Sequence, residues 1–177
     1  MVDDERVRVG DSILQVYFHQ LFSDEPTLLN LGRRAWRLEQ RELQWTPGRG
    51  HKAWEDGFRV AIRRVYESFY RGTESDLRAA LRSIDLEPAT DLFIEHFGAG
   101  SAGPVRFATT DFVKSFHRIF VRCRDEKIRL HSDFLPLGLY LASLYESLEA
   151  LDVALDVRSA FERGSVSMPK NEESFAT

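Results

Sequence analysis

The amino-acid sequence predicts a mainly α-helical protein, with a single domain of about six or seven helices and a possible small β-hairpin near residues 35–46. Apolar residues recur at helical spacing along most of the chain, most continuously in residues 131–157. The chain has 177 residues, of which 43% are hydrophobic and 12% are aromatic. This is enough for one domain that buries roughly 70% of the unfolded surface. The single cysteine, Cys123, excludes an internal disulfide framework.

The two ends of the chain are expected to lie outside the helical domain. Residues 1–10 are charged and are predicted to be flexible, and the helical domain is predicted to span residues 11–164. Residues 165–177 have little to bury and are predicted to form a disordered tail. The N-terminal segment has no apolar signal core, so a reducing, cytoplasmic location is expected.

The first helix is predicted to begin at Asp11 or Ser12, either of which could cap it. Its apolar residues recur at helical spacing from Ile13 to Phe22. The segment Ser23–Pro26 should end this helix, because the residue before a proline avoids helical geometry.

Two structures are possible for residues 27–50. Trp36, Leu38, Leu43 and Trp45 alternate with charged residues around a polar centre, which favours a short hairpin with apolar side chains on one face. A helix from Thr27 to Glu42 is the competing prediction. The sequence TPGRG that follows Trp45 is typical of a loop.

Three helices are predicted between residues 52 and 97. Residues 52–71 place apolar side chains on one face, and Gly72 stands where the helix should end. Thr73 and Asp76 resemble a capping box that starts the next helix. A third helix is expected at Glu87–Phe97, with a proline in its first turn.

Three further features are predicted in the second half of the chain. Residues 99–104 should be a loop, and Thr109 or Thr110 should cap the helix that follows. The most apolar helix, residues 133–151 with Ser132 as its cap, is expected to be central and buried on most sides. It is at the lower length limit for a membrane span and contains two glutamates, which excludes that role. Asp156 should cap a last short helix.

No catalytic or metal-binding motif is present. None of the histidines pairs with another at helical spacing, and there is no glycine-rich phosphate loop or nucleophile elbow. We therefore predict no metal and no cofactor. Cys123 lacks a neighbouring base and is expected to be a buried, inert thiol.

Two sets of residues are candidates for binding. Arginines are frequent in residues 33–71, next to two tryptophans, and could form an anionic-ligand or nucleic-acid surface, although such residues are more often solvated faces. The predicted binding surface consists of Trp36, Trp45, Arg37, Arg41, Arg59 and Arg63. A second possibility is an inter-helix pocket for a lipid, quinone or haem, lined by His96, His117, Phe97, Phe116 and Tyr140.

Residues 56–157 resemble the C-terminal helical part of AarF/UbiB-like atypical kinases. DGFRVAIRRVYESFYRGTESDLRAALRSIDLEPA resembles a helix pair of that family, in which an "R-G-[DT]" turn precedes a helix like LRxALxxLGL. LHSDFLPLGLYLASLYESLEALDVALDV resembles a later segment, with Glu146 or Glu149 and then Leu151–Asp152 at the matching positions. The resemblance implies a kinase-like large lobe from a family of ATP-binding proteins tied to quinone or lipid metabolism.

The catalytic parts of that family do not carry over to this chain. The His-x-Asp-Pro-His-Pro-Gly-Asn loop and the Asp-Phe-Gly motif are absent, and the chain is too short to include a small lobe. Phosphoryl transfer needs carboxylate and amide groups that hold magnesium. The resemblance therefore implies a relative without catalytic activity.

The leading functional prediction is a non-catalytic interaction or regulatory domain whose most probable partner is another protein. The alternatives are a small-molecule binding protein or enzyme with an inter-helix pocket, and a nucleic-acid binder that uses residues 33–71. The net charge of −4 gives nucleic-acid binding no general support.

Overall fold

The computed structural model describes residues 2–40 and 42–165, with the backbone alone described at residues 99–102. It is mainly helical, as predicted. The α-helices of the described residues are α1 (Asp3–Phe22), α2 (Asp56–Arg71), α3 (Glu74–Arg82), α4 (Thr90–Ala102), α5 (Thr109–Asp125), α6 (Phe134–Glu149) and α7 (Val157–Gly164).

Three short antiparallel strand pairs and two 3-10 turns complete the described fold. The pairs are β1 (Thr27–Leu28) with β4 (His51–Lys52), β2 (Trp36–Glu39) with β3 (Glu42–Trp45), and β5 (Val105–Arg106) with β6 (Ala154–Leu155). The 3-10 turns are η1 (Arg33–Ala35) and η2 (Glu87–Ala89). The hairpin interpretation of residues 35–46 is confirmed, and the competing helix from Thr27 to Glu42 is wrong. Gln40, at the hairpin turn, adopts a φ of 49°.

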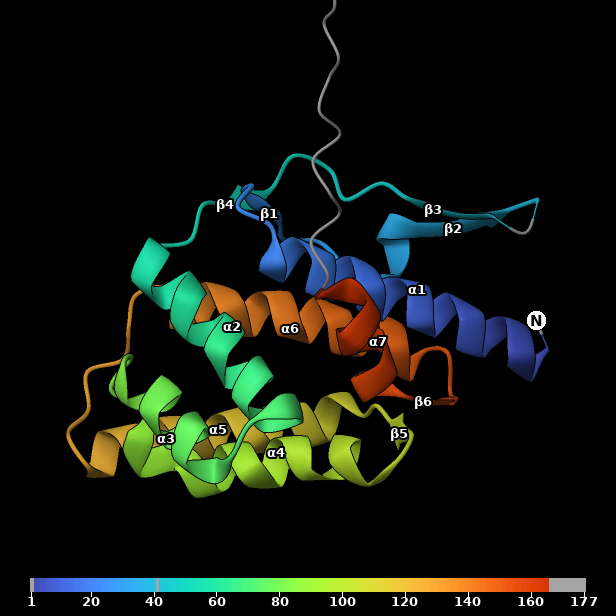
Figure 1. The fold of residues 1–177 in the computed structure, drawn as a ribbon. Coiled ribbons are helices and arrows are strands. Elements are labelled where there is room, and N and C mark those ends of the chain that lie inside the picture. Colours follow the sequence, from blue (N-terminus) through green and yellow to red (C-terminus); the bar gives the residue numbers. More distant parts are fainter. Residues whose placement is uncertain (1, 41, 166–177) are drawn as a thin grey trace, which may run out of the picture.

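The helix α6 passes through the middle of the molecule (Figure 1), with α1 above it in the view and α4 and α5 below. It buries Leu137, Tyr140, Leu144 and Leu148, so its central position agrees with the prediction. The expectation that it is buried on most sides is only partly correct. Leu139 is 66% exposed, which shows that α6 is apolar over a wider arc than its neighbours cover.

The N-terminal residues correct one prediction. Residues 1–10 were expected to be flexible, but α1 begins at Asp3, eight positions ahead of Asp11. Val9 is buried, and Gly10 packs closely against Leu155, from the far end of the chain. This contact joins the two ends of the chain, so the local sequence could not predict it. Met1, and the predicted tail apart from Ser165, lie outside the described residues.

The helix ends confirm some predicted caps and correct others. Thr73 and Asp76 form the predicted capping box, and Asp156 accepts from the backbone N–H of Ser159 at 3.0 Å. However, α4 continues to Ala102, so the expected loop at residues 99–104 is wrong over most of its length. At α6 the N-cap position belongs to Asp133 instead of Ser132.

The start of α5 is also capped differently from the prediction. Neither Thr109 nor Thr110 caps it, since Ala108 holds the N-cap position. Instead, Glu149 at the end of α6 accepts hydrogen bonds from the backbone N–H and the hydroxyl of Thr109, at 3.2 and 2.6 Å. A carboxylate is favourable at a helix N-terminus, and this contact fixes how α5 lies along α6.

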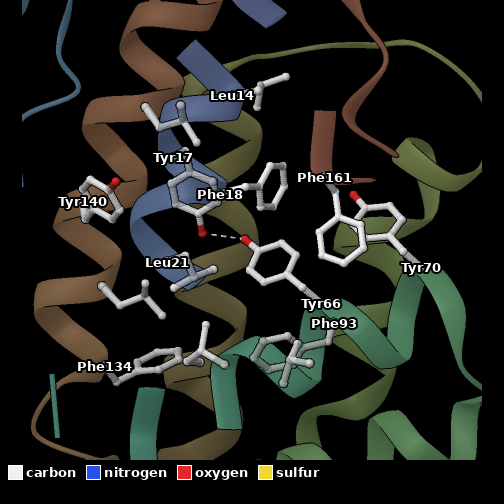
Figure 2. Packing of buried hydrophobic residues seen from close by; sticks show 14 of the residues in the cluster. Leu14, Tyr17, Phe18, Leu21, Tyr66, Tyr70, Phe93, Phe134, Tyr140 and Phe161 are labelled. Atoms are coloured by element: carbon white, nitrogen blue, oxygen red, sulfur yellow. Dashed lines mark hydrogen bonds between the residues drawn. The ribbon is translucent and has the colours of Figure 1, made fainter. Parts of the chain in front are cut away.

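Aromatic rings fill the space between α1, α2, α6 and α7 (Figure 2). The hydroxyl groups of Tyr17 and Tyr66 lie 2.7 Å apart, and one donates to the other. The ring of Phe161 on α7 packs edge-on against Phe18 and stacks on Tyr70. Each such ring pair adds roughly 0.5–1.5 kcal/mol beyond area burial, so this cluster holds the two ends of the chain together.

Candidate functional site

The β2–β3 hairpin carries the two tryptophans that the sequence singled out, and the structure brings them together. Trp36 and Trp45 are cross-strand partners, with ring centroids 5.5 Å apart and planes inclined by 17°. The indole N–H of Trp36 donates to the carbonyl oxygen of Leu31 at 2.8 Å, and that of Trp45 donates to the carbonyl oxygen of Asn30 at 3.0 Å. Both rings are half-buried. The tryptophans therefore anchor the hairpin to the backbone of Asn30 and Leu31, and they do not form a free aromatic surface.

Leu31 connects the base of this hairpin to α6. Its backbone N–H donates to Oγ of Ser143 at 3.1 Å, and its carbonyl oxygen accepts from Oγ of Ser147 at 2.5 Å. Leu31 is completely buried. Buried backbone groups are costly unless they are paired, so these bonds hold the hairpin base in one position on the core.

A groove of about 240 Å³ lies between the hairpin, the N-terminal half of α1 and the C-terminal end of α6. Most of its lining is apolar, and Leu38 on the hairpin remains 40% exposed. The side chains of Arg33 and Arg37 also line it. Its apolar lining residues are Val9, Ile13, Trp36, Leu38, Leu43, Ala150 and Leu151. The groove therefore has a mostly apolar lining that includes two arginine side chains.

Two arginines line this groove, Arg33 and Arg37. They and the neighbouring Arg34 are exposed, and none of the three forms an ion pair within the described part of the chain. Arg41, at the hairpin turn, lies outside the described residues. The two exposed guanidinium groups of the groove, those of Arg33 and Arg37, can bind carboxylates without first breaking an ion pair of the described residues.

Two predicted members of the binding surface have a different role. Arg63 donates from Nε to the carbonyl oxygen of Leu21 at 2.8 Å, and from its terminal nitrogens to Ser23 and Asp24. Arg59 donates to the carbonyl oxygen of Asp24 at 2.9 Å. Their side chains are only 19% and 17% exposed. Both arginines hold the turn after α1, so their donors are already engaged within the protein.

The predicted inter-helix pocket corresponds to two small cavities of about 60 and 50 Å³. His96 and Phe97 line both cavities, and Phe116 lines the smaller one. His96 is largely buried, which lowers the pKa of its imidazole, and Oη of Tyr145 lies 3.3 Å from its Nε2. Ligand sites for small molecules usually enclose about 300–1,000 Å³, so neither cavity is large enough for a lipid, quinone or haem.

The other two predicted pocket residues line neither cavity. His117 is exposed on α5, beside Glu95 and Lys114. Tyr140 is completely buried and accepts a hydrogen bond from Nε2 of Gln20 at 2.7 Å. Placing His117 and Tyr140 in one pocket was therefore incorrect, because helical spacing alone did not define which face of each helix meets the cavity.

One polar cluster was missed by the sequence analysis. Asp133 is 4% exposed and binds Nζ of Lys52 at 2.7 Å, while it accepts from the backbone N–H of Glu55 at 2.8 Å. Nε2 of His131 lies 3.3 Å from the Glu55 carboxylate. Desolvation raises the pKa of Asp133, but the hydrogen bond from Glu55 and the Lys52 charge outweigh it and leave the pKa below its usual value. The cluster joins β4 and α2 to the start of α6.

Several other chemical features can be placed directly. Cys123 is buried, and desolvation raises the pKa of its thiol, so it lacks the thiolate character of a nucleophile. Within residues 2–40 and 42–165, no group of three or more histidine, cysteine, aspartate or glutamate side chains could hold a metal ion. No helix of the same residues has both the length and the apolar character needed to cross a bilayer.

Comparison with known proteins found no match: no protein-family model, curated protein or solved structure is similar to this chain.

Proposed function

We propose that this chain is a non-catalytic interaction domain that binds an acidic segment of a partner protein in the groove beside the β2–β3 hairpin. The observation that carries this proposal is an apolar groove lined by two exposed arginines, Arg33 and Arg37, that form no ion pair with the residues that the structure describes. Interfaces favour arginine and aromatic side chains around a desolvated centre.

The chemistry of the groove defines the partner segment. Apolar side chains of the segment would fill the floor between α1 and the hairpin, next to Leu38 and Leu43. Its carboxylates would bind the guanidinium groups of Arg33 and Arg37, as charge-assisted hydrogen bonds favour. Such a segment alternates acidic and large apolar residues. Because rim charges act mainly on association rate and specificity, we expect binding to weaken as salt is added.

The other functions have less support. The nucleic-acid alternative relied in part on Arg59 and Arg63, which are occupied by the turn around Asp24. The small-molecule alternative relied on an inter-helix pocket whose cavities are about 60 and 50 Å³. The kinase-like relationship remains a prediction, and we propose it only in its non-catalytic form. Steady ATP hydrolysis by the purified protein, abolished by replacing one acidic residue, would contradict the non-catalytic part of the proposal.

A peptide titration tests the proposed groove. The probe is a fluorescein-labelled synthetic peptide that alternates glutamate with leucine and phenylalanine, compared with a matched peptide in which lysine replaces glutamate. We expect the acidic peptide to bind with a Kd on the order of 10 µM and the basic peptide to bind at least tenfold more weakly. Equal affinity for the two peptides, or no binding of the acidic one, would overturn the proposal.

Matched variants locate the binding site. Leu38→Asp should raise the Kd for the acidic peptide about tenfold or more, since it places a carboxylate in an apolar contact. Val60→Asp is its control, because Val60 lies on α2 and is exposed to the same degree, 41% against 40%. If both variants, or neither, weaken binding, the peptide does not occupy the hairpin groove.

A further inference from the structure

Exposed apolar side chains concentrate on one surface of the molecule, away from the hairpin groove. Among the described residues, eight large apolar side chains are exposed, and four of these belong to α5 and α6. These four, called here the α5–α6 face, are Val113 (57% exposed), Phe120 (36%), Leu135 (58%) and Leu139 (66%). Singly scattered apolar residues need no explanation, but a contiguous group marks an interaction site.

Contacts between the helices show how α5 and α6 lie together. The two helices run in opposite directions, with Thr109 bound to Glu149 at one end and Phe120 packed on Phe134, with centroids 6.0 Å apart, at the other. In the middle, the ring of Phe116 lies so close to Gly138 that any larger residue at that position would clash.

Helical geometry then places the four exposed residues on a single face. An α-helix turns by about 100° per residue, so Val113 and Phe120 lie on the same side of α5, and Leu135 and Leu139 on the same side of α6. Ile119 and Leu137 lie on the opposite sides of the α5–α6 contact, where they line the smaller internal cavity. The four exposed residues therefore form one apolar strip over the seam between the two helices.

The two ends of this strip carry opposite charges. Glu146 lies two turns beyond Leu139, at the end of the strip near Val113. It is exposed, and it forms no ion pair within the described part of the chain. At the other end, Arg124 lies one turn beyond Phe120 and binds only its neighbour Asp125, in an exposed pair. Because the helices are antiparallel, the carboxylate of Glu146 lies towards one end of the strip, and the guanidinium group of Arg124, in its exposed pair with Asp125, lies towards the other.

We propose that the α5–α6 face binds a second copy of this chain through a two-fold axis that passes close to Leu139. A surface with opposite charges at its two ends is complementary to itself when it is rotated by half a turn. This rotation places Glu146 of each copy against Arg124 of the other, and Leu135 against Val113. The resulting dimer buries the apolar strip and packs the helix pairs as a four-helix layer.

Sedimentation velocity of the full chain over a concentration series tests this proposal. We expect a reversible dimer, and Leu139→Glu should raise the dimer dissociation constant about a hundredfold or more. Leu139 is mostly exposed, so this variant should fold normally, which circular dichroism checks. Val60→Glu on α2 is the matched control. A wild-type protein that remains monomeric at concentrations on the order of 100 µM would overturn the proposal, as would a dimer that Leu139→Glu does not weaken.

Charge exchange tests the two-fold arrangement itself. Glu146→Arg and Arg124→Glu should each raise the dissociation constant about tenfold, because each places like charges together twice in the dimer. Combining the two changes in one chain should restore the wild-type value to within about threefold. A double variant that stays as weak as the single variants would exclude this axis. Leu38→Asp should leave dimerisation unchanged, so failure of the hairpin proposal can be separated from failure of this one.

Discussion

The arginines of α2 and those of the hairpin carry the same charge but have different surroundings. On α2, Arg63 donates hydrogen bonds to two backbone carbonyl oxygens and to the carboxylate of Asp24. Only 19% of its side chain is exposed. At the hairpin, Arg33 and Arg37 are exposed beside an apolar groove and have no acidic partner in the described chain. The first arrangement contributes to the stability of the fold, whereas the second leaves the guanidinium groups in contact with solvent.

The largest effect on stability should come from Asp133, a buried carboxylate that is paired with Lys52. Replacing Asp133 with alanine leaves Lys52 and the backbone N–H of Glu55 without their partner, so we expect unfolding to become easier by about 3 kcal/mol. Urea denaturation measures this. The control is Ser132→Ala, at the exposed neighbouring position, which should change stability by less than about 0.5 kcal/mol. Similar losses in both variants would show that Asp133 has no special role.

The same residue predicts the response to acid. The pKa of Asp133 in the folded protein lies below its usual value of about 3.8, so its contribution to stability is complete above that pH and is lost as the pH falls through the folded pKa. We therefore expect the Asp133→Ala protein to lose less stability than the wild type between pH 4 and pH 2. A parallel fall in both proteins would contradict this assignment.

A neighbouring pair of arginines on α2 tests the central contrast. Arg63→Ala should destabilise the protein by about 2 kcal/mol, because it removes charged donors from the turn after α1. Arg64→Ala, at the next residue, should cost less than about 0.5 kcal/mol, since Arg64 is exposed and has no ion pair in the described chain. Arg37→Ala should resemble Arg64→Ala in urea denaturation. If Arg37→Ala lost as much stability as Arg63→Ala, the distinction between arginines that are bonded within the fold and arginines that are exposed would be contradicted.

A smaller, pH-dependent effect should come from His96, one of the predicted pocket residues. Burial lowers the pKa of His96 below its usual value of about 6.5, so the unfolded chain takes up this proton first and stability falls as the pH drops below that value. We expect His96→Gln to flatten the stability profile in this range. A profile that the variant leaves unchanged would show that His96 is not the group that titrates.

The smallest effect concerns how rigidly the hairpin is held. Gln40 has a positive φ of 49°, a conformation that costs most residues roughly 1 kcal/mol and that asparagine adopts more easily. Gln40→Asn should therefore stabilise the hairpin by about 0.5 kcal/mol and slow hydrogen exchange at β2 and β3. Acidic-peptide binding should become slightly tighter, because a more rigid hairpin loses less conformational freedom on binding. Faster exchange in the variant would contradict the assigned turn geometry.

Local patterns in the sequence correctly predicted the features that depend on neighbours in the chain. The capping box at Thr73, the cap at Asp156 and the paired tryptophans of the hairpin all involve residues within ten positions of one another. The hairpin itself was predicted for the same reason, because Trp36 and Trp45 alternate with polar residues.

The errors concern contacts between residues far apart in the chain. Arg63 and Asp24 are separated by 39 positions, so spacing could not show that this arginine is already occupied. Val9 lies in a segment that looks merely charged, yet it lines the groove with Leu151. The exposure of Leu139 was also missed, since an apolar helix does not reveal which of its sides a neighbour leaves uncovered.

The most direct test of the central claim is a reciprocal charge exchange measured by peptide titration. The protein carries Arg33→Glu together with Arg37→Glu, and the probes are the acidic peptide and its lysine-substituted counterpart. We predict that the acidic peptide loses at least tenfold in affinity and that the lysine peptide gains about as much. Arg64→Glu should change neither value. Unchanged affinity for both peptides after the exchange would contradict the claim that Arg33 and Arg37 bind the carboxylates of an acidic partner.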